Sequence, residues 1–121
     1  IGSLVWRTIA VMPHDAKHFV EKVDFITTPG YLSGAGAREK AGLPPGTGPY
    51  RVVTDLALMG FDEETKRMKL LALNPGVELE QVEENTGFKL IIPERIEKNE
   101  PPTEKELKIL REEIDPTKLY I

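Results

Sequence analysis

The sequence predicts an α/β fold built on an open sheet, with an antiparallel section and short helices. Three observations lead to this prediction. The short apolar run from Thr8 to Met12 is typical of a strand in an α/β interior. Two further strand-like runs, Tyr50 to Phe61 and Met68 to Leu73, are joined by a polar connector suited to a hairpin. Short segments with helical spacing are mixed among these strands.

The N-terminal third is expected to begin with a strand. Thr8 to Met12 is expected to be buried on both faces and ends at Pro13, which cannot donate to a neighbouring strand. Asp15 to Val20 is expected to form a turn of helix. Val23 to Thr27 alternates in polarity, which predicts a second strand ending at Pro29-Gly30.

A long glycine-rich loop follows. Residues 30–49 hold six glycines and three prolines, and only Ala35 to Ala41 has a composition suited to a short helix. A loop of this length in a compact domain is usually functional or mobile. Beyond it, we expect Tyr50 to Phe61 and Met68 to Leu73 to form an antiparallel pair across the connector DEETKR.

The segment after this hairpin predicts a turn and a short helix. Asn74-Pro75-Gly76 is a turn sequence, and Glu78 to Glu84 places Leu79 and Val82 at helical spacing. Gly87 follows, and it can supply a left-handed cap to the end of this helix.

The C-terminal quarter predicts one more strand, a linker and a final helix. Lys89 to Ile92 is the strand, and residues 93–102 form a charged linker that contains prolines. Thr103 and Glu106 have the spacing of a capping box that opens a helix. The apolar stripe of that helix consists of Leu107, Leu110 and Ile114.

Length, charge and composition restrict the possible functions. The 121 residues fit a single domain, 1–121. With 16 Lys+Arg scattered among 20 Asp+Glu, we expect no nucleic-acid partner. The absence of cysteine excludes disulfides and a thiolate nucleophile, and it favours a reducing, cytoplasmic setting. No apolar run approaches the roughly 20 residues that cross a bilayer, so we expect no membrane partner.

The start of the chain has the character of a piece cut from a larger protein. The first apolar run follows Ile1 within a few residues, without a preceding cap or turn signal. A fragment of a larger sheet leaves an apolar edge or face uncovered. We therefore expect this chain to associate with another chain, as part of an oligomer.

Two histidines raise the question of a metal site. His14 and His18 are four residues apart, which would place both imidazoles on one face of a helix, with Asp15 between them. No further acid stands at catalytic spacing, and Pro13 just ahead does not support a helix that presents both imidazoles. We therefore interpret them as surface or loop-anchoring histidines and assign no metal.

The stretch PGYLSGAGARE is the first candidate for ligand binding. It follows a predicted strand and precedes a possible helix, so that free backbone N–H groups could face a phosphate or a carboxylate. It lacks the Lys-Ser/Thr ending of a phosphate loop and the third glycine of the dinucleotide fingerprint. Neither ATP nor NAD binding is therefore predicted.

Isolated polar residues give weaker indications. Asp55 interrupts an apolar run and could orient a ligand, but the favoured interpretation is an exposed carboxylate or one that satisfies a nearby loop backbone. Arg38 and Arg51 could face an anion, although isolated arginines are usually solvated. Ser3 and Ser33 lie in glycine contexts unlike the nucleophile elbow, so a hydrolytic triad is unsupported.

Almost the whole chain is covered by four stretches in this order: RTIAVMPHDAKHFVEKVDFITTPGYL, GPYRVVTDLALMGFD, NPGVELEQVEENTGFKLIIP and PPTEKELKILREEIDP. Together they resemble the C-terminal half of the small (beta) subunit of family I coenzyme A transferases, of the glutaconate and 3-oxoacid types. Several segments in the right order are more specific than any single motif.

This resemblance implies an open α/β subunit fold and a partner alpha subunit. It also implies transfer of CoA between an acyl-CoA and a carboxylic acid, through a glutamyl-CoA thioester on a glutamate of the small subunit. The CoA thioester would be a substrate, and no permanently bound cofactor is expected. The nucleophilic glutamate is expected upstream of this sequence, so the chain would be an enzyme fragment that is inactive alone.

The tetrapeptide Glu84-Asn85-Thr86-Gly87 superficially matches the surroundings of that nucleophile, because the family's glutamate also lies near an asparagine and a glycine. It falls at a predicted helix end, where asparagine and glycine act as caps. No catalytic residue is therefore assigned to this chain.

The resemblance places the glycine-rich loop near the CoA or acyl site. The residues expected to bind substrate, through backbone contacts, are Gly30, Tyr31, Gly34 and Gly36. Two alternatives stay open: a stand-alone interaction domain of the same ancestry, and a subunit of a related CoA-ester hydrolase.

Overall fold

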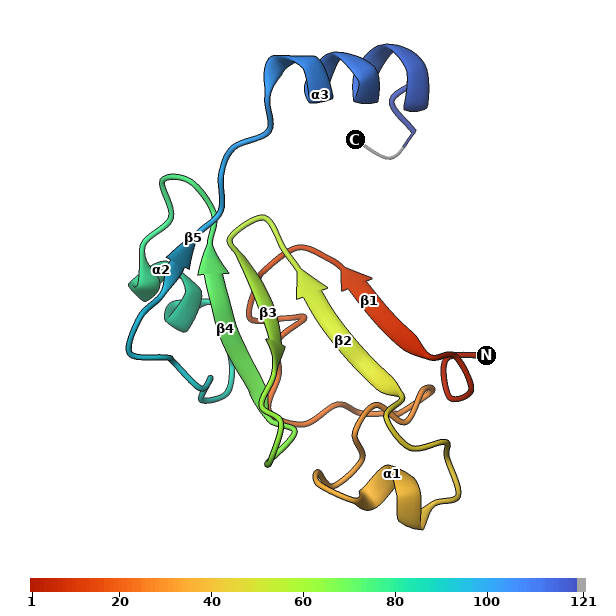
Figure 1. Cartoon of the computed structure of the whole chain (residues 1–121). Coiled ribbons are helices and arrows are strands. Elements are labelled where there is room, and N and C mark those ends of the chain that lie inside the picture. Colours follow the sequence, from red (N-terminus) through yellow and green to blue (C-terminus); the bar gives the residue numbers. More distant parts are fainter. Residues whose placement is uncertain (120–121) are drawn as a thin grey trace.

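The computed structural model describes residues 1–119 and shows a mixed, open sheet. The strands lie in the order of the sequence: β1 (Arg7–Val11), β2 (Gly48–Val53), β3 (Ala57–Phe61), β4 (Met68–Leu73) and β5 (Glu97–Lys98). The two outer strands pair in parallel with their neighbours, whereas β2, β3 and β4 form an antiparallel meander (Figure 1). The predicted open sheet with an antiparallel section is confirmed.

The helices are short. They are α1 (Ala37–Lys40), α2 (Leu79–Glu84) and α3 (Glu104–Ile109), which continues into a π-helical turn, η1 (Leu110–Ile114). Figure 1 shows α1 beyond the end of the sheet where β2 begins, α2 beside β4 and β5, and α3 away from the sheet. Among residues 1–119, no helix has the length and apolar character needed to cross a membrane.

The core lies on one face of the meander. Alternate strand residues such as Val52 and Leu70 point to this face, where Val82 of α2 covers them. Full burial of such side chains stabilises the fold by about 1.5–3 kcal/mol each. The buried hydrophobic cluster consists of Phe19, Val52, Ala57, Met59, Leu70, Leu73, Val82 and Leu90.

The predicted strand from Tyr50 to Phe61 is wrong as a single element, because it turns back on itself between β2 and β3. The hydroxyl of Thr54 accepts hydrogen bonds from the amides of Leu56, at 3.2 Å, and Ala57, at 2.9 Å. A side-chain oxygen thus makes a turn without glycine or proline. The predicted antiparallel pairing across DEETKR, between β3 and β4, is confirmed.

The expectation that the first strand is buried on both faces is wrong. β1 is an edge strand, and the side chains of Ile9 and Val11 on its outer face are 58% and 79% exposed. The layer that covers β2 to β4 does not reach this face, so the apolar run is half-buried, and on one side only.

Two other predicted strands are also corrected. Residues 23–27 pair with no strand, and Phe25 is 80% exposed, because alternation alone supplies no hydrogen-bonding neighbour. The segment Lys89 to Ile92 makes a single parallel bridge, between Ile91 and Lys69. The strand that pairs beyond it is β5, which lies inside the predicted linker.

The helix predictions are largely confirmed. Asp15 starts one helical turn, with hydrogen bonds from the amides of His18 and Phe19 to its carbonyl oxygen. The capping box of Thr103 and Glu106 is present in α3. The predicted apolar stripe of this helix does not reach a core, since Ile114 is 70% exposed.

Candidate functional site

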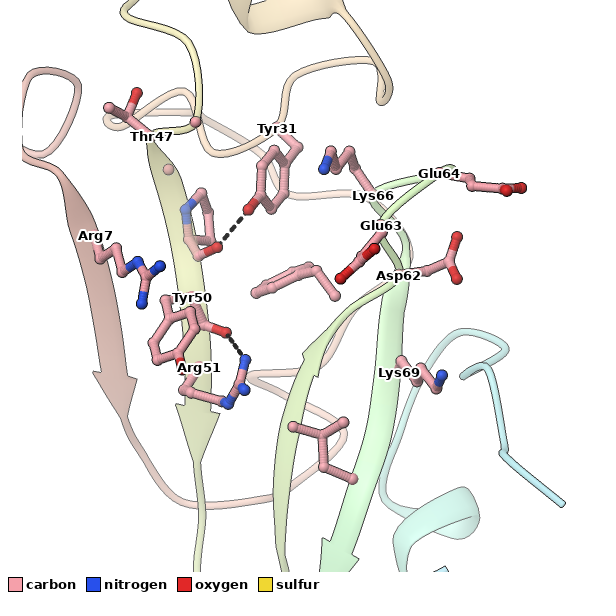
Figure 2. Close-up of a pocket in the computed structure, with 15 residues that line it drawn as sticks. Arg7, Tyr31, Thr47, Tyr50, Arg51, Asp62, Glu63, Glu64, Lys66 and Lys69 are labelled. Atoms are coloured by element: carbon pink, nitrogen blue, oxygen red, sulfur yellow. Dashed lines mark hydrogen bonds between the residues drawn. The ribbon is translucent and has the colours of Figure 1, made fainter. Parts of the chain in front are cut away.

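A cavity of about 670 Å³ lies where β2 begins and β3 ends. Its walls come from β1, from the end of the glycine-rich loop and from the connector between β3 and β4 (Figure 2). The lining residues are Arg7, Tyr31, Gly46, Thr47, Gly48, Pro49, Tyr50, Arg51, Phe61, Asp62, Glu63, Glu64, Lys66, Lys69 and Leu71. Its size is that of a pocket for a small molecule or part of a cofactor.

The pleat of the sheet places basic side chains on the cavity side. Val52 and Leu70 are buried in the core, so their neighbours Arg51 and Lys69 project from the opposite face. Gly60 of β3 leaves room for this arrangement. A Cβ atom there would lie 3.2 Å from Nη1 of Arg51 and 2.9 Å from Cδ1 of Leu71.

Two arginines gather around one aromatic ring. The guanidinium carbons of Arg7 and Arg51 lie 4.3 and 3.9 Å from the centroid of the Tyr50 ring. Each contact contributes about 0.5–1 kcal/mol at such partly exposed sites. Arg51 also donates a hydrogen bond from Nη1 to the carbonyl oxygen of Tyr50, at 2.8 Å. The two side chains are therefore held in place beside the cavity.

The acidic residues of the connector are arranged differently. Asp62 accepts hydrogen bonds from the amide of Thr65, at 2.8 Å, and from its hydroxyl, at 2.7 Å. These bonds hold the pKa of the Asp62 carboxyl below its ordinary value. Figure 2 shows the Asp62 and Glu64 carboxylates pointing away from the cavity and Glu63 pointing toward it.

Tyr31 lies in the wall of this cavity. Its hydroxyl donates a hydrogen bond to the carbonyl oxygen of Pro49, at 2.5 Å, and its ring packs edge-on against Phe61 with a centroid distance of 5.1 Å. Burial raises the pKa of the Tyr31 hydroxyl, so this group stays protonated. The Nζ atom of Lys66 lies 5.6 Å from the centroid of the same ring.

The other three predicted substrate residues are divided between two smaller cavities. Gly34 and Gly36 line a cavity of about 130 Å³ that shares Tyr31 and Lys66 with the large one. Gly30 lines a third, mainly apolar cavity of about 250 Å³, which shares Pro49, Arg51 and Phe61 with the large one. The structure thus brings Tyr31, Gly34 and Gly36 to one cavity, while Gly30 faces a neighbouring one.

Arg38 is not solvated, which corrects the interpretation from the sequence. It is 2% exposed, and its guanidinium donates to the carbonyl oxygens of Gly30, at 2.7 Å, and Ser3, at 3.2 Å, and to the hydroxyl of Thr47, at 3.0 Å. These acceptors lie in three separate parts of the chain. Arg38 therefore fastens the glycine-rich loop to the N-terminal segment.

The two histidines occupy separate environments. His14 is buried between Thr54 and Thr86, whose hydroxyls lie 3.1 and 2.9 Å from its ring nitrogens. His18 is exposed, and its Nδ1 atom lies 2.8 Å from Asp15. The interpretation as loop-anchoring and surface histidines is confirmed. Within residues 1–119, no three His, Cys, Asp or Glu side chains gather where they could hold a metal ion.

Asp55 is exposed at the turn between β2 and β3, and it accepts a hydrogen bond from the backbone amide of His14 at 2.7 Å. The favoured interpretation, a carboxylate that satisfies a nearby loop backbone, is confirmed. Arg51 does face the large cavity. Its companions Arg7, Lys66 and Lys69 give no local signal in the sequence, because single charged residues in different elements show no common pattern.

The fold is shared with solved enzyme structures. Glutaconate coenzyme A-transferase from Acidaminococcus fermentans superposes with a TM-score of 0.87 at 44% identity, covering 95% of this chain and 44% of that chain. IpdAB from Rhodococcus jostii superposes with a TM-score of 0.72 at 27% identity, covering 93% of this chain and 45% of that chain. An open α/β sheet of the transferase type is therefore established.

Sequence comparison gives the family. The sequence profile described as "Coenzyme A transferase" matches residues 4–85, and the chain belongs to this family. It is 46% identical over 115 residues to the beta subunit of glutaconate CoA-transferase of Acidaminococcus fermentans, covering 95% of this chain and 43% of that protein. It is 37% identical to the beta subunit of 3-oxoadipate CoA-transferase of Pseudomonas knackmussii, covering 92% of this chain and 42% of that protein. The chain thus spans less than half the length of these relatives.

Proposed function

We propose that this chain is part of the beta subunit of a coenzyme A transferase, which moves CoA between an acyl-CoA and a carboxylic acid. The observation that supports this most is the 46% identity to the beta subunit of glutaconate CoA-transferase across 95% of the chain. The corresponding subunit of a second transferase follows at 37%. The cholesterol ring-cleaving hydrolase IpdB subunit of Rhodococcus jostii is 29% identical, which makes a hydrolase the less favoured alternative.

The mechanism that we propose is covalent. A glutamate carboxylate attacks the thioester carbonyl of acyl-CoA, so that the CoA thiolate leaves and an acyl-glutamyl anhydride forms. The thiolate then attacks the glutamyl carbonyl, which releases the first acid and leaves a glutamyl-CoA thioester. The second acid reverses these steps. The nucleophilic glutamate lies outside this chain in our proposal, and the chain contributes no catalytic residue.

The part assigned to this chain is substrate binding and subunit association. Tyr31, Gly34 and Gly36 border connected cavities, which supports a ligand-facing role for this loop. Gly30 is retained as a substrate residue although it lines a different cavity. We further propose an alpha subunit as partner, an acyl-CoA and a carboxylic acid as substrates, and no permanently bound cofactor.

An exchange assay tests this proposal. The complete subunit that contains this chain is produced with its alpha subunit, and CoA transfer from acetyl-CoA to glutaconate or 3-oxoadipate is followed by mass spectrometry. We expect transfer to the acid without net hydrolysis of the thioester. Hydrolysis to free CoA in place of transfer would favour the hydrolase alternative.

The position of the covalent intermediate needs a separate measurement. Borohydride reduces a glutamyl thioester to an alcohol, and this mass change can be located by peptide mapping after incubation with acyl-CoA. We expect the reduced residue in a peptide outside Ile1 to Ile121. A reduced glutamate within these residues, for example Glu84, would contradict the assignment.

A further inference from the structure

Four cations and three carboxylates line the large cavity, and none of these cations forms a salt bridge within residues 1–119. The salt bridges among those residues lie elsewhere, at His18–Asp15 and Lys108–Glu112. The four cations are Arg7, Arg51, Lys66 and Lys69.

The carboxylates of the cavity do not balance these cations. Hydrogen bonds from Thr65 lower the pKa of the Asp62 carboxyl, and Lys69 lies close enough to add to this effect. Asp62 and Glu64 nevertheless point away from the cavity, which leaves Glu63 as the carboxylate that points toward it (Figure 2). Three of the four cations are half-buried, and a partly desolvated charge that is not fully paired is unfavourable. An anion in the cavity would supply the missing negative charge.

The arginines have free donors for such an anion. Arg51 uses one N–H group on the carbonyl oxygen of Tyr50, and none of its other side-chain N–H groups meets an acceptor among the described residues. The side chain of Arg7 makes no hydrogen bond within that part of the chain. Both guanidinium groups are fixed against the ring of Tyr50, so their planar forks are oriented before a ligand arrives.

The distribution of charge favours several anionic groups over a single carboxylate. Arg7 and Arg51 come from the strands β1 and β2, whereas Lys66 comes from the connector and Lys69 from β4 (Figure 2). One carboxylate needs one arginine fork. A cavity of about 670 Å³ with cations on two walls fits a larger ligand with several negative charges.

We propose that this cavity binds the phosphate groups of the CoA substrate, with Arg51 and Arg7 on one wall and Lys66 and Lys69 on the other. CoA carries a pyrophosphate and a 3′-phosphate on its nucleotide end, and its thiol end carries no charge. The inference rests on the proposed function for the identity of the ligand. The geometry alone specifies a polyanion site.

The test compares two thioesters in the complete two-subunit enzyme. Acetyl-CoA has all the phosphates, and acetyl-pantetheine has none but presents the same reacting group. Arg51→Gln is expected to raise the KM for acetyl-CoA by about 10- to 100-fold, since a lost charge-assisted hydrogen bond has that magnitude. The KM for acetyl-pantetheine should change less than about threefold, because its binding does not use this site.

Further variants separate binding from folding. Arg51→Lys should recover part of the loss, because it keeps the charge but not the fork. Lys69→Gln removes a cation from the other wall and should raise the KM for acetyl-CoA by about 3- to 10-fold. The effect is smaller than that of Arg51→Gln because a lysine contacts phosphate as a single point charge. Arg95→Gln is the matched control, since Arg95 is exposed and lies outside the cavity.

Three outcomes would overturn the inference. These are an equal rise of KM for both thioesters, a rise of KM for the acid alone, or no effect of Arg51→Gln and Lys69→Gln in folded enzyme. Failure of the proposed function is recognised separately, by a wild-type complex that transfers CoA to no acid. In that case titration calorimetry with CoA decides, and loss of CoA binding in Arg51→Gln would still support the polyanion site.

Discussion

The backbone amide of Gly87 donates a hydrogen bond to the carbonyl oxygen of Phe19 at 2.6 Å, and a Cβ atom on Gly87 would lie 2.5 Å from that same oxygen. This close approach joins the segment after α2 to the core residue Phe19. The sequence suggested a left-handed cap at Gly87, which is wrong, because Asn85 ends α2 and Gly87 does not have a positive φ. The glycine is needed for space.

Gly87→Ala is therefore expected to destabilise the fold by about 1–3 kcal/mol, the usual effect of forcing an extra methyl group into a packed site. Urea unfolding followed by circular dichroism measures this difference. Gly30→Ala is the control, because a Cβ there would make an ordinary 3.5 Å contact with Pro49. Equal stability of Gly87→Ala and wild type would refute the packing argument.

His14 predicts a pH dependence of stability. Burial lowers the pKa of the His14 imidazole below its ordinary value of about 6.5, although Asp55 and Asp15 oppose this. The folded state therefore favours neutral His14. Its contribution is complete above pH 6.5 and is lost as the pH falls from there toward the lowered pKa, with a slope of at most about 1.4 kcal/mol per pH unit. His14→Gln does not titrate, and its unfolding free energy should fall less over this range. If the unfolding free energies of wild type and His14→Gln changed equally with pH, the prediction would be wrong.

A conservative substitution of Arg38 is expected to loosen the glycine-rich loop. Arg38→Lys keeps the charge but cannot reach Gly30, Ser3 and Thr47 together, so we expect destabilisation on the order of 3 kcal/mol. Cleavage by trypsin after Lys40 should become faster, because the loop is released. Arg95→Lys, on an exposed arginine, should leave both properties unchanged.

A comparison of two Tyr→Phe variants measures the contribution of the hydrogen bond that Tyr31 makes in the candidate substrate loop. Tyr31→Phe removes the donor to the Pro49 carbonyl oxygen and should lower stability by about 1 kcal/mol. Tyr50→Phe removes a hydroxyl that has no hydrogen-bond partner in the described part of the chain, so stability should be unchanged. A comparison of melting temperatures suffices, and equal losses in both variants would argue against the Tyr31 bond.

Gly60 predicts an effect on ligand binding. The methyl group of Gly60→Ala would crowd Nη1 of Arg51, at 3.2 Å, and the flexible end of Leu71, at 2.9 Å. If Arg51 binds phosphate, this variant should raise the KM for acetyl-CoA several-fold. The KM for acetyl-pantetheine should stay nearly unchanged, as in Arg51→Gln. The KM values of both thioesters provide the check. An unaltered preference for acetyl-CoA would show that Arg51 tolerates the displacement or does not bind the ligand.

Elements with strong local signals could be predicted from the sequence. The capping-box spacing of Thr103 and Glu106 predicted the start of α3. The polar connector between two apolar runs predicted the pairing of β3 with β4. The turn between β2 and β3 could not be found in this way. It contains neither glycine nor proline, and its geometry depends on hydrogen bonds to the hydroxyl of Thr54. Its local sign was the pair of polar residues Thr54 and Asp55 within the apolar run.

Long-range contacts decided what the sequence could not show. Arg38 has no apolar context that foretells its burial, since its acceptors come from the N-terminal segment and from the loop beyond α1. The cavity assembles in the same way: Arg7 is brought to Arg51 by the parallel pairing of β1 with β2. Such residues become neighbours only through strand register. No local sequence pattern therefore shows that they line the same cavity.

The strand pairing also bears on how the chain folds. β2, β3 and β4 are joined by turns of a few residues, whereas β1 and β5 each reach their neighbour after a much longer connection, across residues 12–47 and 74–96. Closing long loops slows the formation of non-local pairs. The central meander should therefore be the folding nucleus, with the outer strands added late. Arg7 and Arg51 would then become neighbours only near the end of folding.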